Sequence, residues 1–190
     1  MILNFEGKLI KRIDRLLDRN IKYKRARGGR GGVFGGVWSP YTPKLILTSL
    51  KNNKIIYAKS NDYRLFVLDK DGNLILEIKK KEKPIPVPKR VRKQKRIFIP
   101  EYCPFLSEIL TDDKGRIWVI KFKSILEKSD EWEIDIFGSD GKYLYYTKIP
   151  YYPFIIKKSH VYSLIRSKET GKVIIKRLKL KNWDRIKYKS

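Results

Sequence analysis

The chain has 190 residues, and its 45 lysine and arginine side chains against 20 acidic ones give a formal net charge of +25. Hydrophobic residues make up 42% of it, which is too many for a disordered chain and enough to bury a core. The single cysteine, Cys103, excludes an intrachain disulfide, and with the lone His160 it cannot form a structural zinc site. The apolar runs are too short to span a bilayer, so the composition predicts a basic globular domain.

Short apolar blocks alternate with turn-forming pairs along the chain, which is the pattern of β-strands joined by tight turns. In chain order the expected strands are 2–5, 8–13, 44–50, 54–59, 63–68, 73–78, 105–111, 116–122, 132–137, 142–148, 153–157, 160–166 and 173–181. The turns between them carry Glu6-Gly7, Asn52-Asn53, Asp71-Gly72, Lys114-Gly115, Asp140-Gly141 and Thr170-Gly171. Asn, Asp and Gly tolerate the positive φ that tight hairpins require, so an all-β fold is expected.

One stretch near the N-terminus also fits a helix. Residues Ile10, Ile13, Leu16, Leu17 and Ile21 recur at intervals of three and four residues, with charged residues between them. The stretch 9–22 therefore forms either a short amphipathic helix or a strand followed by an irregular linker.

The strand pattern repeats within the chain. Segments 44–60 and 105–122 both contain a strand, a polar turn and a second strand, and segments 63–78 and 132–149 both contain a hairpin with Asp-Gly at its turn. The first pair of segments forms the first half of a repeating unit, and the second pair forms its second half. The opening residues 2–13 match the second half, and residues 153–181 match the first half plus a third strand. The chain thus holds two complete four-stranded units flanked by incomplete ones.

Three motifs add detail to this repeat. They are the glycine-rich run from Gly29 to Phe34 with Pro40 after it, the segment from Asp112 to Val119, and the segment from Phe66 to Gly72. Together they resemble the linker and hairpins of six-bladed, NHL-like β-propellers. The resemblance implies four-stranded antiparallel blades in an incomplete ring. The expected units are 1–28 (end of a partial blade and a basic linker), 29–96 and 97–150 (full blades), and 151–190 (a three-stranded blade and a basic tail).

An incomplete ring would leave apolar blade faces open. The first expectation is that the chain is the C-terminal part of a longer propeller, because Met1 falls next to a strand. The second is association with itself or with another half-propeller through the open faces. The third is an open arc.

Most of the positive charge lies in three segments, 8–30, 79–96 and 157–190, with net charges of +8, +9 and +10. These are either solvated loops or a surface that binds anions or nucleic acid. Alternating prolines in 79–96 predict an extended arm that projects its charges. The RGG-like run 25–32 fits RNA binding, but Phe34 and Pro40 after it favour an inter-blade linker. The candidate anion-binding residues are Lys89, Arg90, Arg92, Lys93, Lys95, Arg96, Arg27 and Arg30.

Other residues with useful chemistry are expected to serve the fold. The aromatic residues Tyr143, Tyr145, Tyr146, Tyr151, Tyr152 and Phe154 are expected to pack between blades rather than stack on a ligand. Asp112 and Asp113 are expected in a turn, and the carboxylates between Asp130 and Asp135 around a solvent-facing strand edge. Cys103 should be buried, and His160 has no nucleophile beside it. No catalytic, metal or cofactor site is predicted.

The resemblance implies a non-enzymatic recognition scaffold for a protein, peptide or glycan, bound by loops at one end of a central channel. The alternative is nucleic-acid binding through the three basic segments. The first residues do not show a signal-peptide pattern, whereas similar propellers are often exported, so the compartment stays open.

Overall fold

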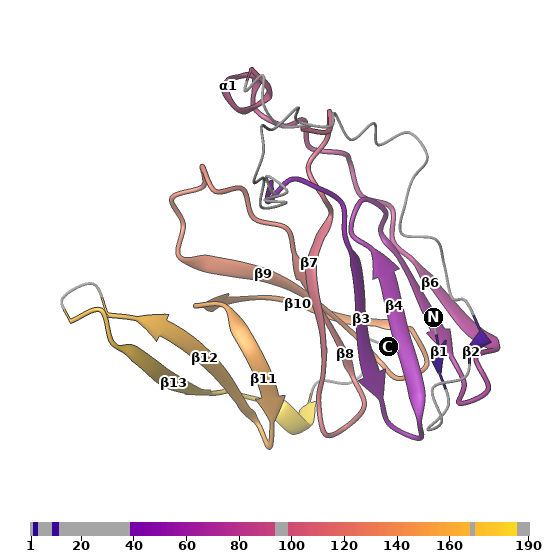
Figure 1. Cartoon of the computed structure of the whole chain (residues 1–190). Coiled ribbons are helices and arrows are strands. Elements are labelled where there is room, and N and C mark those ends of the chain that lie inside the picture. Colours follow the sequence, from indigo (N-terminus) through magenta and orange to yellow (C-terminus); the bar gives the residue numbers. More distant parts are fainter. Residues whose placement is uncertain (1, 4–8, 12–38, 94–98, 168–169, 186–190) are drawn as a thin grey trace, which may run out of the picture.

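The computed structural model describes residues 2–3, 9–11, 39–93, 99–167 and 170–185, and the regular secondary structure of these residues is almost entirely β-strand (Figure 1). A short pair is formed by β1 (Ile2–Leu3) and β2 (Leu9–Lys11). The first sheet contains β3 (Leu45–Leu50), β4 (Lys54–Lys59), β5 (Arg64–Leu68) and β6 (Leu74–Lys79). The second contains β7 (Leu106–Thr111), β8 (Ile117–Lys121), β9 (Glu131–Phe137) and β10 (Tyr143–Pro150). The third contains β11 (Pro153–Lys157), β12 (His160–Arg166) and β13 (Val173–Lys179).

Each sheet is an antiparallel meander in which every strand pairs with its neighbour in the chain. The all-β, hairpin-connected fold expected from the sequence is therefore confirmed, with strand bounds shifted by a few residues. Of the stretch 9–22, residues 9–11 are strand β2, and the remainder lies outside the described residues, as does the Glu6-Gly7 turn. None of the three sheets closes on itself.

Two helical turns complete the described part of the chain. They are α1 (Lys89–Arg92), between the first and second sheets, and the 3₁₀ turn η1 (Trp183–Arg185) after the third. Neither is long or apolar enough to cross a membrane.

The hairpin turns lie at the Asn and Gly residues that the sequence analysis placed in turns. Asn52 and Asn53 both have positive φ, and Gly72, Gly115, Gly141 and Gly171 sit in the left-handed region of their own turns. The turn between β11 and β12 falls between the two expected strands, but no Asn, Asp or Gly signals it: Lys158 and Ser159 adopt positive φ there.

The three sheets pack face to face, so the second sheet, between the other two, buries apolar residues on both of its faces. The first core lies between the first and second sheets: Ile46, Ile56, Ala58, Tyr63, Leu65, Val67 and Ile78 face Leu106, Ile109, Ile117, Val119 and Phe137. The second core joins the second sheet to the third and to η1: Trp118, Ile120, Ile134, Ile136, Leu144 and Ile149 face Ile156, Val161 and Trp183. Since β7 lies beside both β3 and β11, the first strands of the sheets are adjacent.

Candidate functional site

The first candidate surface is the set of turns that follow β3, β7 and β11. The Thr111 hydroxyl donates to the Ser49 carbonyl at 3.0 Å, and the Asp113 carboxylate accepts the backbone N–H of Lys158 at 3.1 Å. These bonds bring the turns of successive sheets to one end of the molecule. The exposed polar residues there are Asn52, Asn53, Asp113, Lys114 and Lys158.

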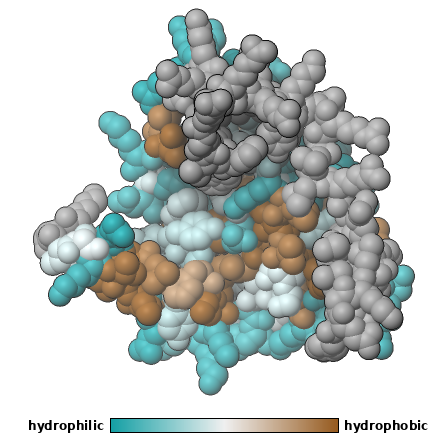
Figure 2. Space-filling view, in the orientation of Figure 1, coloured by the Kyte–Doolittle hydropathy of each residue, from teal (hydrophilic) through white to brown (hydrophobic). Residues whose placement is uncertain are grey.

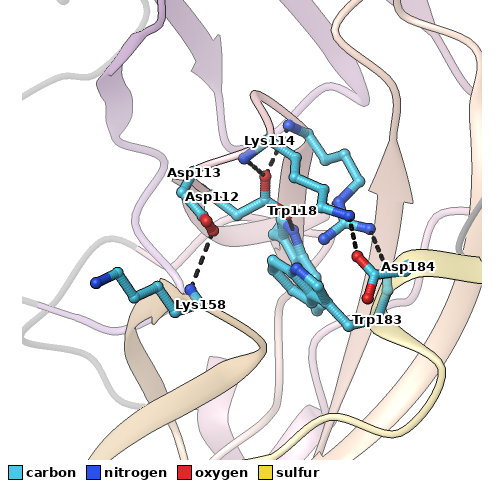
Figure 3. Close-up of polar contacts among 8 residues, drawn as sticks. Asp112, Asp113, Lys114, Trp118, Lys158, Trp183 and Asp184 are labelled. Atoms are coloured by element: carbon cyan, nitrogen blue, oxygen red, sulfur yellow. Dashed lines mark hydrogen bonds and ion pairs between the residues drawn. The ribbon is translucent and has the colours of Figure 1, made fainter.

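Beneath these turns, Asp112 anchors the β7–β8 hairpin (Figure 3). Its carboxylate accepts the backbone N–H groups of Lys114 and Arg116 at 2.8 and 3.0 Å. It also accepts Arg116 Nε at 2.6 Å and Trp118 Nε1 at 2.8 Å. Asp112 therefore has the turn role expected from the sequence, and its oxygens are occupied by protein donors.

Arg116 connects this hairpin to the C-terminal turn η1. Its guanidinium lies 3.8 Å from the centre of the Trp183 ring, and its Nη1 donates to the Trp183 carbonyl at 3.0 Å. Lys114 forms an ion pair with Asp184, which lowers the pKa of that carboxyl (Figure 3). The cluster thus holds η1 against the second sheet.

A second polar cluster lies between the first and second sheets. Asp135 is fully buried and accepts Tyr63 Oη at 2.5 Å, Tyr143 Oη at 3.1 Å and Lys80 Nζ at 2.7 Å. Burial, followed by the Asp135 charge, raises the pKa of Tyr63. The expectation that Asp135 belongs to a solvent-facing edge is wrong, because β9 is an interior strand whose face packs against the first sheet.

Glu82 extends this cluster toward the surface. It pairs with Lys80 at 2.9 Å and with Lys121 at 3.4 Å. Burial alone would raise the pKa of Glu82, but the hydrogen bond from Lys80 and the charge of Lys121 outweigh it and lower the pKa. No cluster of metal-ligating side chains occurs in the part of the chain that the structure describes.

The second candidate surface is the basic segment around α1. Lys89, Arg90, Arg92 and Lys93 are all exposed on this single helical turn or at its end. The remaining predicted residues, Lys95, Arg96, Arg27 and Arg30, lie outside the described residues. The charges project outward as expected, but the extended form expected for the whole segment is wrong at residues 89–92, which are helical.

Burial of apolar residues holds α1 in place. Val87 donates its N–H to the Glu101 carbonyl at 2.9 Å, and Cys103 donates its N–H to the Ile85 carbonyl at 2.8 Å. Val91 is buried in a small core with Tyr41, Val87 and Cys103. Cys103 is buried in the same core, as expected from the sequence, and this burial raises the pKa of its thiol. Packing of Val91 and the backbone hydrogen bonds of Val87 and Cys103 therefore anchor the turn that carries the cations.

The structure adds an aromatic residue to the basic surface that sequence reasoning missed. Tyr102 is 47% exposed, and a β-bridge places it opposite Pro86, three residues before Lys89. No local pattern indicates this neighbour, because the two segments are joined only by tertiary pairing.

The tyrosines of β10 differ from expectation. Tyr143, Tyr145 and Tyr146 are exposed, whereas Leu144 is buried. The predicted packing between blades is wrong for Tyr145 and Tyr146, because β10 is the outer strand of its sheet. Tyr143 packs in part as expected: its ring lies edge-on to Phe137, and its hydroxyl donates to the buried Asp135. Tyr152 does pack in the second core, edge-on to Trp132.

His160 lies at the start of β12, where its Nδ1 is 2.7 Å from the Lys158 carbonyl oxygen.

Comparison with known proteins gives no family for the chain: no protein-family model matches it, and no curated protein does. The geometry described above is therefore the basis for any functional assignment.

Proposed function

We propose that the protein is a non-enzymatic recognition scaffold, built as part of an NHL-like β-propeller, that binds a protein, peptide or glycan. The observation that supports this proposal most directly is the position of β7 beside both β3 and β11. In a propeller, the first strands of successive blades line the central channel, and loops at one end of that channel bind ligands.

The polar clusters favour binding over catalysis. The carboxylates of Asp112 and Asp135 are each occupied by donors from the protein itself. A carboxylate held in this way positions structural elements, and it has little capacity left to move a proton on a substrate.

The proposal is tested by screening the chain against peptide and glycan arrays, then mapping a bound ligand by amide hydrogen exchange. Protection is expected at the turns after β3, β7 and β11, that is, at residues 51–53, 112–115 and 158–159. Lys114→Ala should weaken binding at least threefold, whereas Lys70→Ala, at the turn after β5, should leave it unchanged. Protection elsewhere, or chemical turnover of the ligand, would contradict the proposal.

A second candidate function is nucleic-acid binding, favoured by the exposed cations at α1 and by the exposed Tyr102, which is bridged to Pro86 in the same basic segment. Cations neutralise phosphates, and an exposed aromatic ring can stack on a base, a combination suited to single strands. The sites of this function are Lys89, Arg90, Arg92, Lys93 and Tyr102.

A labelled thymidine oligonucleotide tests this second function. The triple change Arg90→Glu, Arg92→Glu, Lys93→Glu should abolish binding at low salt. A matched triple reversal of the exposed residues Lys70, Lys128 and Lys142, which lie outside the three basic segments, should preserve it. Tyr102→Ala should cost about 5- to 160-fold in affinity, from stacking worth ~1–3 kcal/mol. Equal loss in both triple variants would show a response to net charge alone.

A further inference from the structure

The third sheet is one strand shorter than the other two. In those, β6 and β10 pair with the third strand of the sheet, whereas the strand order β11-β12-β13 ends at β13. One edge of β13 therefore has no strand partner among the described residues. Such an edge presents unpaired backbone groups that can bond to another strand.

The hydrogen-bond pattern identifies the residues that face this edge. Leu180 N–H donates to the Ser159 carbonyl at 2.7 Å, and Ser167 N–H donates to the Lys172 carbonyl at 2.9 Å. Bonded and non-bonded pairs alternate along an antiparallel ladder, so the β13 residues between these two bonds alternate in direction. The residues that turn their N–H and C=O groups to the open edge are Val173, Ile175, Arg177 and Lys179.

The side chains next to the edge form an exposed aliphatic patch. Val173 and Ile175 are 61% and 64% exposed, and on the same face Leu164 and Ile155 are 52% and 46% exposed. Hydrophobic residues gather over the part of the molecule where β11, β12 and β13 lie (Figures 1 and 2). On the opposite face, Ile156 and Val161 are buried in the second core.

The sequence of β13 defines the chemistry of a strand that would fit. Its first half, Val173–Ile175, is aliphatic, and its second half contains Lys176, Arg177 and Lys179. The three strands of this sheet contain no aspartate or glutamate. Opposite charges and paired aliphatic side chains stabilise neighbouring strands, so the matching strand is half aliphatic and half acidic.

A second copy of the chain is a poor match. In the antiparallel register that pairs the full length of two β13 strands, Lys176 would face its own copy, and Ile175 would face Arg177. Registers that pair only the aliphatic halves leave the remaining residues of β13 without a partner. Each copy also carries a net charge of +25. Like charges directly opposite one another destabilise strand pairing.

We propose that the open edge of β13 binds an extended, half-aliphatic and half-acidic segment of a partner protein by strand addition. The C-terminal end of β13 meets the turn after β11, where Leu180 N–H donates to the Ser159 carbonyl, but Val173–Lys179 are not among the turn residues of the first proposal. Amide protection along β13 and protection at all three turns are therefore separate outcomes, and the two proposals can fail independently.

The probe is a synthetic peptide in which a run of glutamates precedes valines and isoleucines, so that antiparallel pairing puts the glutamates opposite residues 176–179. The reversed order serves for parallel pairing. Fluorescence anisotropy should show binding of one order. N-methylation of alternate peptide nitrogens should weaken that binding at least tenfold, because it removes the bonds to the edge without changing charge. A scrambled peptide of equal composition should bind at least tenfold more weakly.

Two variants complete the experiment. Arg177→Glu should weaken binding at least tenfold, whereas the exposed control Lys70→Glu should leave it unchanged, with folding of both checked by circular dichroism. The proposal is overturned if neither peptide order binds, or if the N-methylated or scrambled peptide binds equally well. A discrete dimer in light scattering that Ile175→Glu converts to monomer would assign the edge to a second copy instead.

Discussion

Asp135 is a buried charge that joins two sheets through three side chains. Tyr63 directly precedes β5 and Lys80 directly follows β6, both in the first sheet, whereas Tyr143 belongs to the same sheet as Asp135. A carboxylate without water must be paired and hydrogen-bonded, so this residue constrains how the two sheets dock.

Replacing Asp135 by alanine is therefore expected to destabilise the protein by about 2–4 kcal/mol, because Lys80 and Tyr63 lose their buried partner. Urea unfolding followed by circular dichroism measures the change. The matched control is Asp62→Ala, whose exposed ion pair with Arg64 is worth about 0–1 kcal/mol. Equal effects of the two substitutions would show that the buried cluster adds nothing to stability.

Glu82 predicts how stability depends on pH. Because Lys80 and Lys121 lower its pKa in the folded state, its contribution is complete above the ordinary glutamate pKa of about 4.3 and is lost as pH falls through the lower, folded value. Glu82→Gln should therefore be less stable than the parent at pH 7, and the difference should shrink below about pH 4. Urea midpoints across this range measure it.

The control for this titration is Glu127→Gln, at an exposed residue that forms no ion pair within the described residues. At pH 7 its stability should lie within about 0.5 kcal/mol of the parent. If the stability difference between Glu82→Gln and the parent grows as the pH falls, the predicted pH dependence is wrong.

At the scale of elements, the hairpin turns also take part in packing between sheets. Gly141, in the turn between β9 and β10, has a φ of +82°, and a Cβ there would lie 2.9 Å from Ile78 Cγ1 and 3.0 Å from Leu76 Cδ2. Gly171, in the turn between β12 and β13, has a φ of +68° with open space around it. Both need glycine for their backbone, but only Gly141 also needs its small size.

Gly141→Ala is therefore expected to destabilise the protein by about 2–4 kcal/mol, the sum of backbone strain and overpacking against the first sheet. Gly171→Ala should cost only the backbone part, about 1 kcal/mol. Thermal and urea unfolding of both variants measure the difference. If the two variants lose the same stability, β6 moves away from the turn at no cost.

At the scale of the whole molecule, the C-terminal turn η1 closes the second core. Trp183 is buried, stacks with Trp118 at a ring distance of 6.1 Å and covers the guanidinium of Arg116. The chain thus returns from the third sheet to the β7–β8 hairpin of the second.

Trp183→Ala should destabilise the protein by about 3–5 kcal/mol, because it leaves a cavity over Trp118 and uncovers Arg116. Amide exchange should then increase in both the second and the third sheet. Lys181→Ala, an exposed change in the same turn, is the control and should shift stability by less than about 0.5 kcal/mol. Faster exchange confined to η1 itself would show that the turn does not close the core.

The sequence predicted the strands well because their signals are local. Alternating apolar residues and pairs such as Asn52-Asn53 and Asp140-Gly141 fix strand and turn within a few residues. The cations at α1 were also predictable as exposed, since charged residues rarely lose their water. The helical turn there was missed because Val91 is helical through its burial against Tyr41 and Cys103, which are distant in sequence.

The sequence by itself determined an all-β chain of repeated hairpins with a strongly basic surface, because strand periodicity, turn chemistry and charge are properties of neighbouring residues. Only the tertiary structure decided that Asp135 is buried while Tyr145 is exposed, that Tyr102 lies beside the basic segment, and that β13 keeps an open edge. Each of these depends on which sheet faces which, and the free energy that decides it comes from contacts between residues far apart in the chain.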